Sequence, residues 1–180
     1  MLINRKLKFV FMHAPKCAGI ALSHWLTEHY GFVNHTDPDQ MCDGSELVER
    51  HRCLLPEDCE GCEIITCTRE PFKRWESFYL YNALEQGVDM SFDQFTRERL
   101  NWLPRQIEYT RHAAYVLRVD DLAEEVRKLP FVTDPVPPLP TLNASRFKVG
   151  YLEMKKRVVW TDEIRDLVRD RFAEDFQIWK

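Results

Sequence analysis

The chain has 180 residues, of which 44% are hydrophobic, and its formal net charge at pH 7 is −4. This length and composition predict one folded domain over residues 1–180 and exclude a largely disordered chain. The acidic balance argues against nucleic acid as the main partner, because nucleic-acid-binding proteins usually carry a basic excess.

The first half of the chain predicts two buried strands, each followed by a helix. Residues 8–13 form a short apolar run, and we expect a helix over residues 19–30 that ends at a glycine cap, Gly31. A second apolar run covers residues 63–68. Pro71 then suits the first turn of the next helix, because the N–H that proline lacks has no helical partner there.

The second half of the chain continues the alternation of helix and strand. Ser91 is a typical N-cap for a helix over residues 91–100, and residues 114–119 are the third predicted strand. Residues 130–140 hold five prolines and predict an extended loop, and Thr161 caps the last helix. This alternation predicts an α/β fold of three layers, with a mainly parallel central sheet flanked by helices on both faces.

The segment between the first strand and its helix, residues 14–19 (APKCAG), is a candidate anion-binding loop. The N–H groups at the start of a helix and the helix dipole attract anions, and Gly19 and Lys16 would add close approach and positive charge. The loop is not a Walker A motif, because its lysine precedes its glycine and no hydroxyl is placed to hold magnesium. An ordinary turn with a solvated lysine fits these residues equally well.

A second candidate follows the second strand. Arg69 lies at the carboxyl end of that strand, which is the edge where open α/β sheets bind ligands. Arg74 and Ser77 are three residues apart on one helical face, and a guanidinium beside a hydroxyl suits a phosphate monoester. The alternative is a surface ion pair of Arg69 or Arg74 with Glu70 or Glu76, which would stabilise little.

Together the two segments resemble the donor site of sulfotransferases that use 3′-phosphoadenosine-5′-phosphosulfate (PAPS). Residues 13–22 (HAPKCAGIAL) are similar to the PKTGGTSL-type loop that binds the 5′-phosphosulfate, and residues 69–81 (REPFKRWESFYLY) to the R-[DE]-P-x-x-R-x-x-S-x-Y segment that binds the 3′-phosphate. Residues 116–122, 139–145 and 172–179 look like later elements of the same family, in the same order, and the likeness is closest to its carbohydrate-type branch. The resemblance implies a sulfotransferase fold of the P-loop NTPase-like kind.

The resemblance also implies a reaction and a set of residues. A sulfuryl group would pass from PAPS to a hydroxyl or amine of a small-molecule or glycan acceptor, without a metal, releasing 3′,5′-adenosine bisphosphate (PAP). Lys16 would stabilise the leaving phosphate, and His35 would take the acceptor's proton, with His13, His51 and Glu49 as alternatives for the base. The implied donor-binding residues are Lys16, Cys17, Ala18, Gly19, Ile20, Ala21, Arg69, Ser77, Asn143, Ser145 and Arg146.

The chain departs from the family where the loop's hydroxyls are replaced by Cys17, Ile20 and Ala21. A module that binds PAP or another nucleotide with little or no catalysis is therefore an alternative function. A small-molecule or nucleotide kinase is a weaker alternative, because it would need magnesium ligands. The acceptor's identity and the oligomeric state stay open.

The six cysteines and the hydropathy pattern bear on the compartment. Cys59 and Cys62, with Cys53, Cys67 and His51 nearby, superficially resemble a zinc cluster, but their irregular spacing favours reduced, mostly structural thiols over a metal site. No run approaches the roughly 20 apolar residues that cross a bilayer, and the N-terminal apolar run is too short for a signal peptide. We therefore expect a cytoplasmic protein with no membrane partner.

Overall fold

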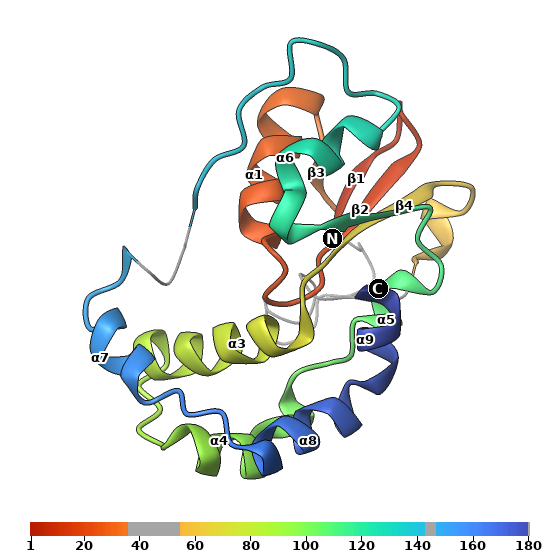
Figure 1. Cartoon of the computed structure of the whole chain (residues 1–180). Helices are drawn as coiled ribbons and strands as arrows, with labels where there is room; N and C mark the ends of the chain where they lie inside the picture. The colour runs from red at the N-terminus through yellow and green to blue at the C-terminus, as the bar shows by residue number, and fades with distance from the viewer. Residues whose placement is uncertain (36–54, 143–146, 180) are drawn as a thin grey trace. The chain divides into compact units, whose positions relative to one another are not determined.

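The computed structural model describes residues 1–35, 55–142 and 147–179 (Figure 1). The chain divides into two compact units, and each has a hydrophobic core of its own. Unit 1 comprises Met1–Thr68 and Glu108–Thr141, and unit 2 comprises Arg69–Ile107 and Leu142–Lys180. This division does not test the prediction of one domain, because a single domain can contain two compact parts.

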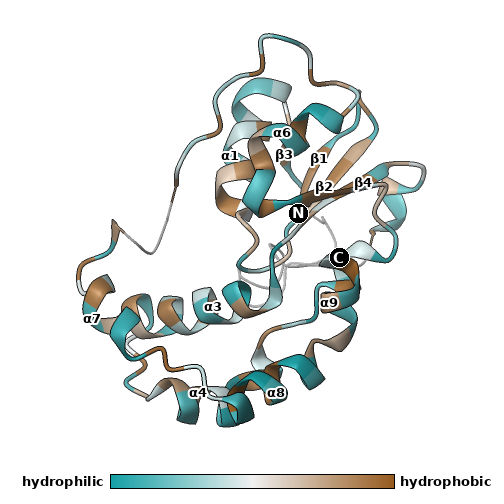
Figure 2. Cartoon of the chain, in the orientation of Figure 1, coloured by the Kyte–Doolittle hydropathy of each residue, from teal (hydrophilic) through white to brown (hydrophobic). Residues whose placement is uncertain are grey.

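Unit 1 is built on a sheet in which five described strands lie in the order β3-β1-β2-β4-β5. Strand β2 is apolar throughout and β4 is apolar at Ile64, Ile65 and Cys67, and brown, the colour of hydrophobic residues, marks these parts of the sheet in Figure 2. The strands are β1 (Leu2–Asn4), β2 (Phe9–Met12), β3 (Val33–Asn34), β4 (Glu63–Thr68) and β5 (Tyr115–Arg118).

The three strands predicted from the sequence, β2, β4 and β5, pair in parallel. The two strands that were not predicted, β1 and β3, pair in an antiparallel way. Strand β2 pairs in parallel with β4, and β4 with β5, while β1 is antiparallel to both β2 and β3. The sheet is therefore mixed, and the prediction of a mainly parallel sheet is wrong for its β3-β1-β2 half. The reason is the tight turn over residues 5–8, which joins β1 to β2 as a hairpin and so forces these strands to run in opposite directions.

Helix α1 (Gly19–Tyr30) follows β2 with the bounds that its sequence predicts. Gly31 ends it in a left-handed conformation, φ 67°, and donates its backbone N–H to Leu26 O. The proline-rich segment 130–140 packs on this helix, because Trp25 Nε1 donates to Pro137 O at 3.0 Å. The remaining helical segments of unit 1 are η1 (Glu57–Cys59), η3 (Val119–Asp121), α6 (Leu122–Glu125) and η4 (Val126–Lys128).

Unit 2 is helical in its described residues. Ser91 and Thr161 cap helices as predicted: each hydroxyl accepts a hydrogen bond from the backbone N–H three residues later. Pro71 occupies the first turn of α3, also as predicted. The helical segments are α3 (Pro71–Glu85), α4 (Phe92–Arg99), η2 (Leu100–Trp102), α7 (Tyr151–Lys156), α8 (Asp162–Arg171) and α9 (Ala173–Trp179), while α5 (Ile107–Thr110) begins at the last residue of the unit's first stretch.

The core of unit 2 is rich in aromatic rings. The ring of Trp75 packs against Phe95 and Phe172, with centroids 5.4 and 6.2 Å apart, and its Nε1 donates to the hydroxyl of the buried Thr96 at 2.9 Å. Such pairs stabilise a core beyond their buried area and leave the indole N–H satisfied. Trp75 on α3 therefore packs against α4 and against the C-cap residue of α8 within this unit. No described helix has the length and apolar character that a bilayer crossing requires.

Candidate functional site

The loop between β2 and α1 has an unusual backbone. Lys16 and Ala18 both adopt the left-handed region, with φ of 66° and 53°, although neither is glycine. A left-handed conformation costs a residue with a side chain about 1–3 kcal/mol, and such strain clusters where ligands bind. Among the described residues, no side chain caps the start of α1, and no acidic residue lies in its first turn. The loop therefore presents a helix N-terminus that is suited to an anion.

Gly19 begins α1 under the imidazole ring of His13. A Cβ at this position would lie 1.7 Å from His13 Cδ2 and 1.9 Å from Nε2, far inside van der Waals contact. The ring itself stacks near Phe11, with centroids 6.3 Å apart. Gly19 is thus required by the close approach of His13, and His13 takes a packing position beside the loop.

Replacing Gly19 with alanine should therefore destabilise the protein by about 1–3 kcal/mol, the usual effect of forcing an extra group into a packed site. Urea unfolding followed by tryptophan fluorescence measures this change. The double variant Gly19→Ala, His13→Ala has room for the methyl group and should recover most of the loss. A single variant as stable as the parent would show that the ring moves aside without cost.

The second candidate segment begins at Arg69, directly after the last residue of β4. Its backbone N–H donates to Gln106 Oε1 at 2.7 Å, and its carbonyl accepts from Gln106 Nε2 at 2.9 Å. Gln106 is 1% exposed, and its own N–H donates to Asp175 Oδ2 at 2.8 Å. The backbone of Arg69 is therefore held on both sides by a buried amide. Sequence analysis missed Gln106, because no local pattern marks it.

Arg74 has a structural role, which corrects the idea that its guanidinium faces a phosphate. It is 1% exposed; its Nη1 lies 3.5 Å from Asp175 Oδ2, and its Nη2 donates to Pro104 O at 2.8 Å. Burial raises the pKa of Asp175, and this effect outweighs the hydrogen bonds from the N–H groups of Gln106 and Ile107. Arg74 thus forms a buried ion pair with Asp175, a partner that the sequence did not suggest.

The acidic residues beside Arg69 also have other partners than the sequence suggested. The carboxylate of Glu70 caps α3 by accepting from the backbone N–H of Lys73 at 2.7 Å, and Glu76 pairs with Lys155. Ser77 is half-buried on α3. Three of the predicted donor-binding residues, Asn143, Ser145 and Arg146, lie outside the described residues. Two of the alternative bases, His51 and Glu49, also lie outside them.

The predicted loop residues form a continuous stretch in the structure. Cys17 is fully buried, and its Sγ donates to Pro15 O at 3.6 Å, so its thiol faces the protein. Ile20 is 45% exposed, and Ala21 lies in the first turn of α1. If this stretch binds an anion, its backbone N–H groups and Lys16 are therefore the groups that would hold it.

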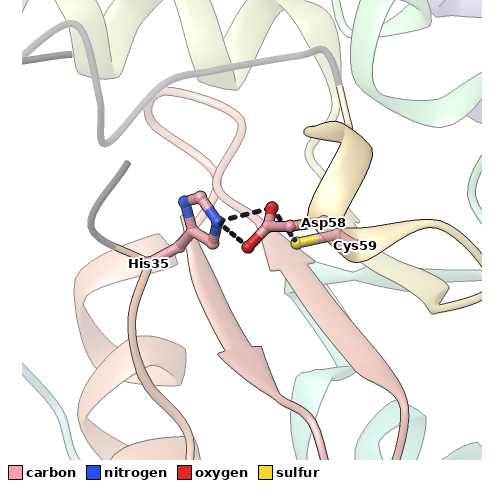
Figure 3. A group of neighbouring side chains, drawn as sticks. All are labelled: His35, Asp58 and Cys59. Atoms are coloured by element: carbon pink, nitrogen blue, oxygen red, sulfur yellow. Dashed lines mark hydrogen bonds and ion pairs between the residues drawn. The ribbon is translucent and has the colours of Figure 1, made fainter. Parts of the chain in front are cut away.

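His35, the predicted base, lies in a separate cluster with Asp58 and Cys59 (Figure 3). It follows β3, and its Nε2 is 3.0 and 3.1 Å from the two carboxylate oxygens of Asp58. The His35 side chain is only 4% exposed. Cys59 is fully buried, and its Sγ donates to Asp58 Oδ1 at 3.5 Å. His35 is therefore held by a carboxylate that sequence analysis had not connected with it.

Arg5 completes this cluster from the turn between β1 and β2. Its Nη2 donates to Asp58 Oδ2 at 2.5 Å, and its Nη1 to the Asp58 carbonyl at 3.0 Å. The hydrogen bonds from Arg5 and then His35 lower the pKa of Asp58 to about 2. Burial, and then the hydrogen bond to Asp58, raise the pKa of the Cys59 thiol to about 11. The cluster thus combines an ionised carboxylate with a protonated thiol at neutral pH.

Comparison of the chain with protein-family models, with curated proteins and with solved structures finds no match in any of the three.

Proposed function

We propose that this protein is a PAPS-dependent sulfotransferase, which moves a sulfuryl group from PAPS to a hydroxyl or amine of a small-molecule or glycan acceptor and releases PAP. The proposal assigns the donor's 5′-phosphosulfate to residues 14–21 and its 3′-phosphate to Arg69 and Ser77. It includes a P-loop NTPase-like sulfotransferase fold, of which the α/β character with β2, β4 and β5 in parallel is the observed part.

The observation that carries the proposal is the strained backbone of the β2–α1 loop. Two left-handed residues with side chains, Lys16 and Ala18, precede an uncapped helix start within the described chain. A turn that only connected a strand to a helix would not need this strain, because glycine or asparagine could occupy these positions at lower cost. An anion that is bound by N–H groups at the helix start would offset the strain and explain why these residues adopt the conformation.

The pairing of β2 with β4 supports the second half of the proposal. The strands are parallel, with Met12 opposite Thr66, and Thr66 Oγ1 donates to Met12 O at 2.8 Å. Their carboxyl ends therefore lie at the same edge of the sheet, where open α/β sheets bind ligands. The anion-binding loop follows one of these strand ends, and Arg69 follows the other in the chain.

A binding module without catalysis is the second candidate, and the buried thiol of Cys17 favours it. Because this side chain donates to Pro15 O, it adds no donor where the resembled family has a hydroxyl. Sulfuryl transfer would then depend on the backbone and on Lys16 to stabilise the charge that develops on the leaving phosphate. The base role of His35 stays a prediction, and it would have to use Nδ1, because Nε2 faces Asp58.

Two measurements test the proposal. Thermal unfolding with PAP, with ADP and with ATP plus magnesium should show the largest rise in Tm for PAP; a larger rise with ATP and magnesium would favour a kinase and overturn it. Transfer of labelled sulfate from PAPS should then be assayed over a panel of small-molecule and glycan acceptors. Labelled product supports the enzyme, whereas PAP binding without any product favours the binding module.

Arg69→Ala should weaken PAP binding about 10- to 100-fold, because a hydrogen bond to a charged group contributes about 1.5–3 kcal/mol. Isothermal titration calorimetry measures this affinity. Arg97→Ala is the matched control, since Arg97 already pairs with Asp93 and Glu163 on the surface. Equal PAP affinity in the two variants would remove Arg69 from the 3′-phosphate site.

A further inference from the structure

We propose that His35, Asp58 and Cys59 form a zinc-binding site that ties the end of β3 to η1. The three residues offer one nitrogen, one oxygen and one sulfur ligand, and these atoms all lie within 4.8 Å of one another. Imidazole and thiolate are the ligands that zinc prefers, and carboxylate oxygen is also common in its sites. This site is separate from the proposed donor-binding residues.

The distances around Asp58 Oδ1 suit a tetrahedral ion. Ligand atoms that bind zinc at about 2.0–2.3 Å lie about 3.3–3.6 Å apart in a tetrahedral site. Asp58 Oδ1 is 3.0 Å from His35 Nε2 and 3.5 Å from Cys59 Sγ. Small side-chain rotations would therefore open room for an ion between the three atoms, as the convergence of the side chains in Figure 3 illustrates.

The surroundings of the cluster would orient its side chains as ligands, and three protein ligands would leave a fourth position of a zinc ion to water. Arg5 donates to Asp58 Oδ2, which also lies 3.1 Å from His35 Nε2, while Oδ1 is the carboxylate oxygen that contacts both His35 and Cys59. Such outer contacts orient the ligands of metal sites. The side chain of His35 is 4% exposed and Cys59 is fully buried, so two of the three donors are already withdrawn from water, while the Asp58 side chain is 47% exposed. A thiolate and a carboxylate would together balance the charge of a divalent cation.

The backbone near Cys59 is fixed by a tight turn. Cys62 N–H donates to Cys59 O at 3.0 Å, Glu60 has φ −55° and ψ 134°, and Gly61 has φ 79°. These angles define a type II β-turn, in which the third residue needs positive φ and is therefore usually glycine. The turn holds Cys59 rigidly at the end of η1. Because zinc replaces the thiol proton, binding should release that proton and strengthen as pH rises.

The test uses the full chain without an affinity tag. Zinc at about 100 times its Kd should raise Tm by about 5–10 °C, because an ion that binds only the folded state stabilises it. Cobalt substituted for zinc should give a thiolate-to-metal charge-transfer band in the near ultraviolet. His35→Ala, Asp58→Asn and Cys59→Ser should each weaken binding at least about 10-fold, and Cys59→Ser should abolish the band.

Cys62→Ser is the matched control, and it should keep both the band and the affinity. Absence of zinc binding by the parent chain would overturn the proposal. Equal zinc affinity in the parent and the three ligand variants would also overturn it. So would loss of the charge-transfer band in Cys62→Ser together with its retention in Cys59→Ser. PAP affinity should stay unchanged in all of these variants, so that failure of this site is distinguishable from failure of the proposed function.

A zinc ion on Nε2 of His35 would also exclude His35 as the base, since the imidazole could no longer accept the acceptor's proton.

Discussion

Replacing Asp175 with alanine is expected to destabilise the protein by about 3–5 kcal/mol, because it leaves the guanidinium of Arg74 buried without its carboxylate. The side chains of Arg74 and Asp175 are 1% and 0% exposed. Asp175 also accepts from the N–H groups of Gln106 and Ile107, at 2.8 and 3.0 Å. The substitution therefore removes the partner of one buried charge and of two backbone donors at once. Such a loss approaches half of the stability of a typical domain.

Urea unfolding measures this loss, and Asp166→Ala on α8 is the control. Asp166 pairs with Arg169 one turn away on an exposed helix surface, where an ion pair contributes at most about 1 kcal/mol. Asp175→Asn, which keeps one carbonyl oxygen for the backbone donors, should fall between the two. If Asp175→Ala lost no more stability than Asp166→Ala, the guanidinium of Arg74 would have to reach water in the folded protein. The description of Arg74 as a buried residue would then be wrong.

Lys16→Ala should lower the rate of sulfate transfer from PAPS by about 10²–10³, since Lys16 is the proposed group that stabilises the charge developing on the leaving phosphate. The loss should appear mainly in kcat, because the backbone N–H groups of the loop would still bind the phosphate. Labelled-sulfate transfer under single-turnover conditions measures the chemical step directly.

Lys6→Ala is the matched control for this experiment. Lys6 is exposed in the turn between β1 and β2, which precedes the amino end of β2, whereas the candidate anion-binding loop follows the carboxyl end of β2. Its removal changes the net charge by the same amount but should leave the rate within a factor of about two. Equal rates in Lys16→Ala and Lys6→Ala would show that the loop's lysine does not act on the reaction, and the catalytic assignment would fail.

Elements with strong local signals could be predicted closely from the sequence. Helix α1 and strand β4 have the predicted bounds, because a glycine cap and a run of β-branched residues mark them within a few positions. The last helix was predicted as one segment from Thr161 onward, yet it breaks at Phe172, where ψ changes to 28° between α8 and α9. No proline or glycine marks this break, so the sequence pattern runs through it.

The two shortest strands could not be predicted, and their antiparallel pairing makes the sheet mixed rather than mainly parallel. Strands β1 and β3 have three and two residues, too few for a hydrophobic period to be recognised. They exist because the tight turn after β1 brings it beside β2 and because β3 then pairs with β1. Pairing between distant residues, rather than local propensity, stabilises them.

The sequence by itself determined the order of β2, β4 and β5 and of the longer helices, the main helix caps and the lysine-bearing loop at the start of α1, because each depends on neighbours within a few residues. Only the tertiary structure decided that Arg74 is buried against Asp175, that Gln106 holds Arg69, and that His35 meets Asp58 and Cys59. These contacts join residues 101, 37 and 23 positions apart. A side chain's charge and hydrogen-bonding groups are written in the sequence, but its partner and its exposure to water depend on which distant segments the core brings together.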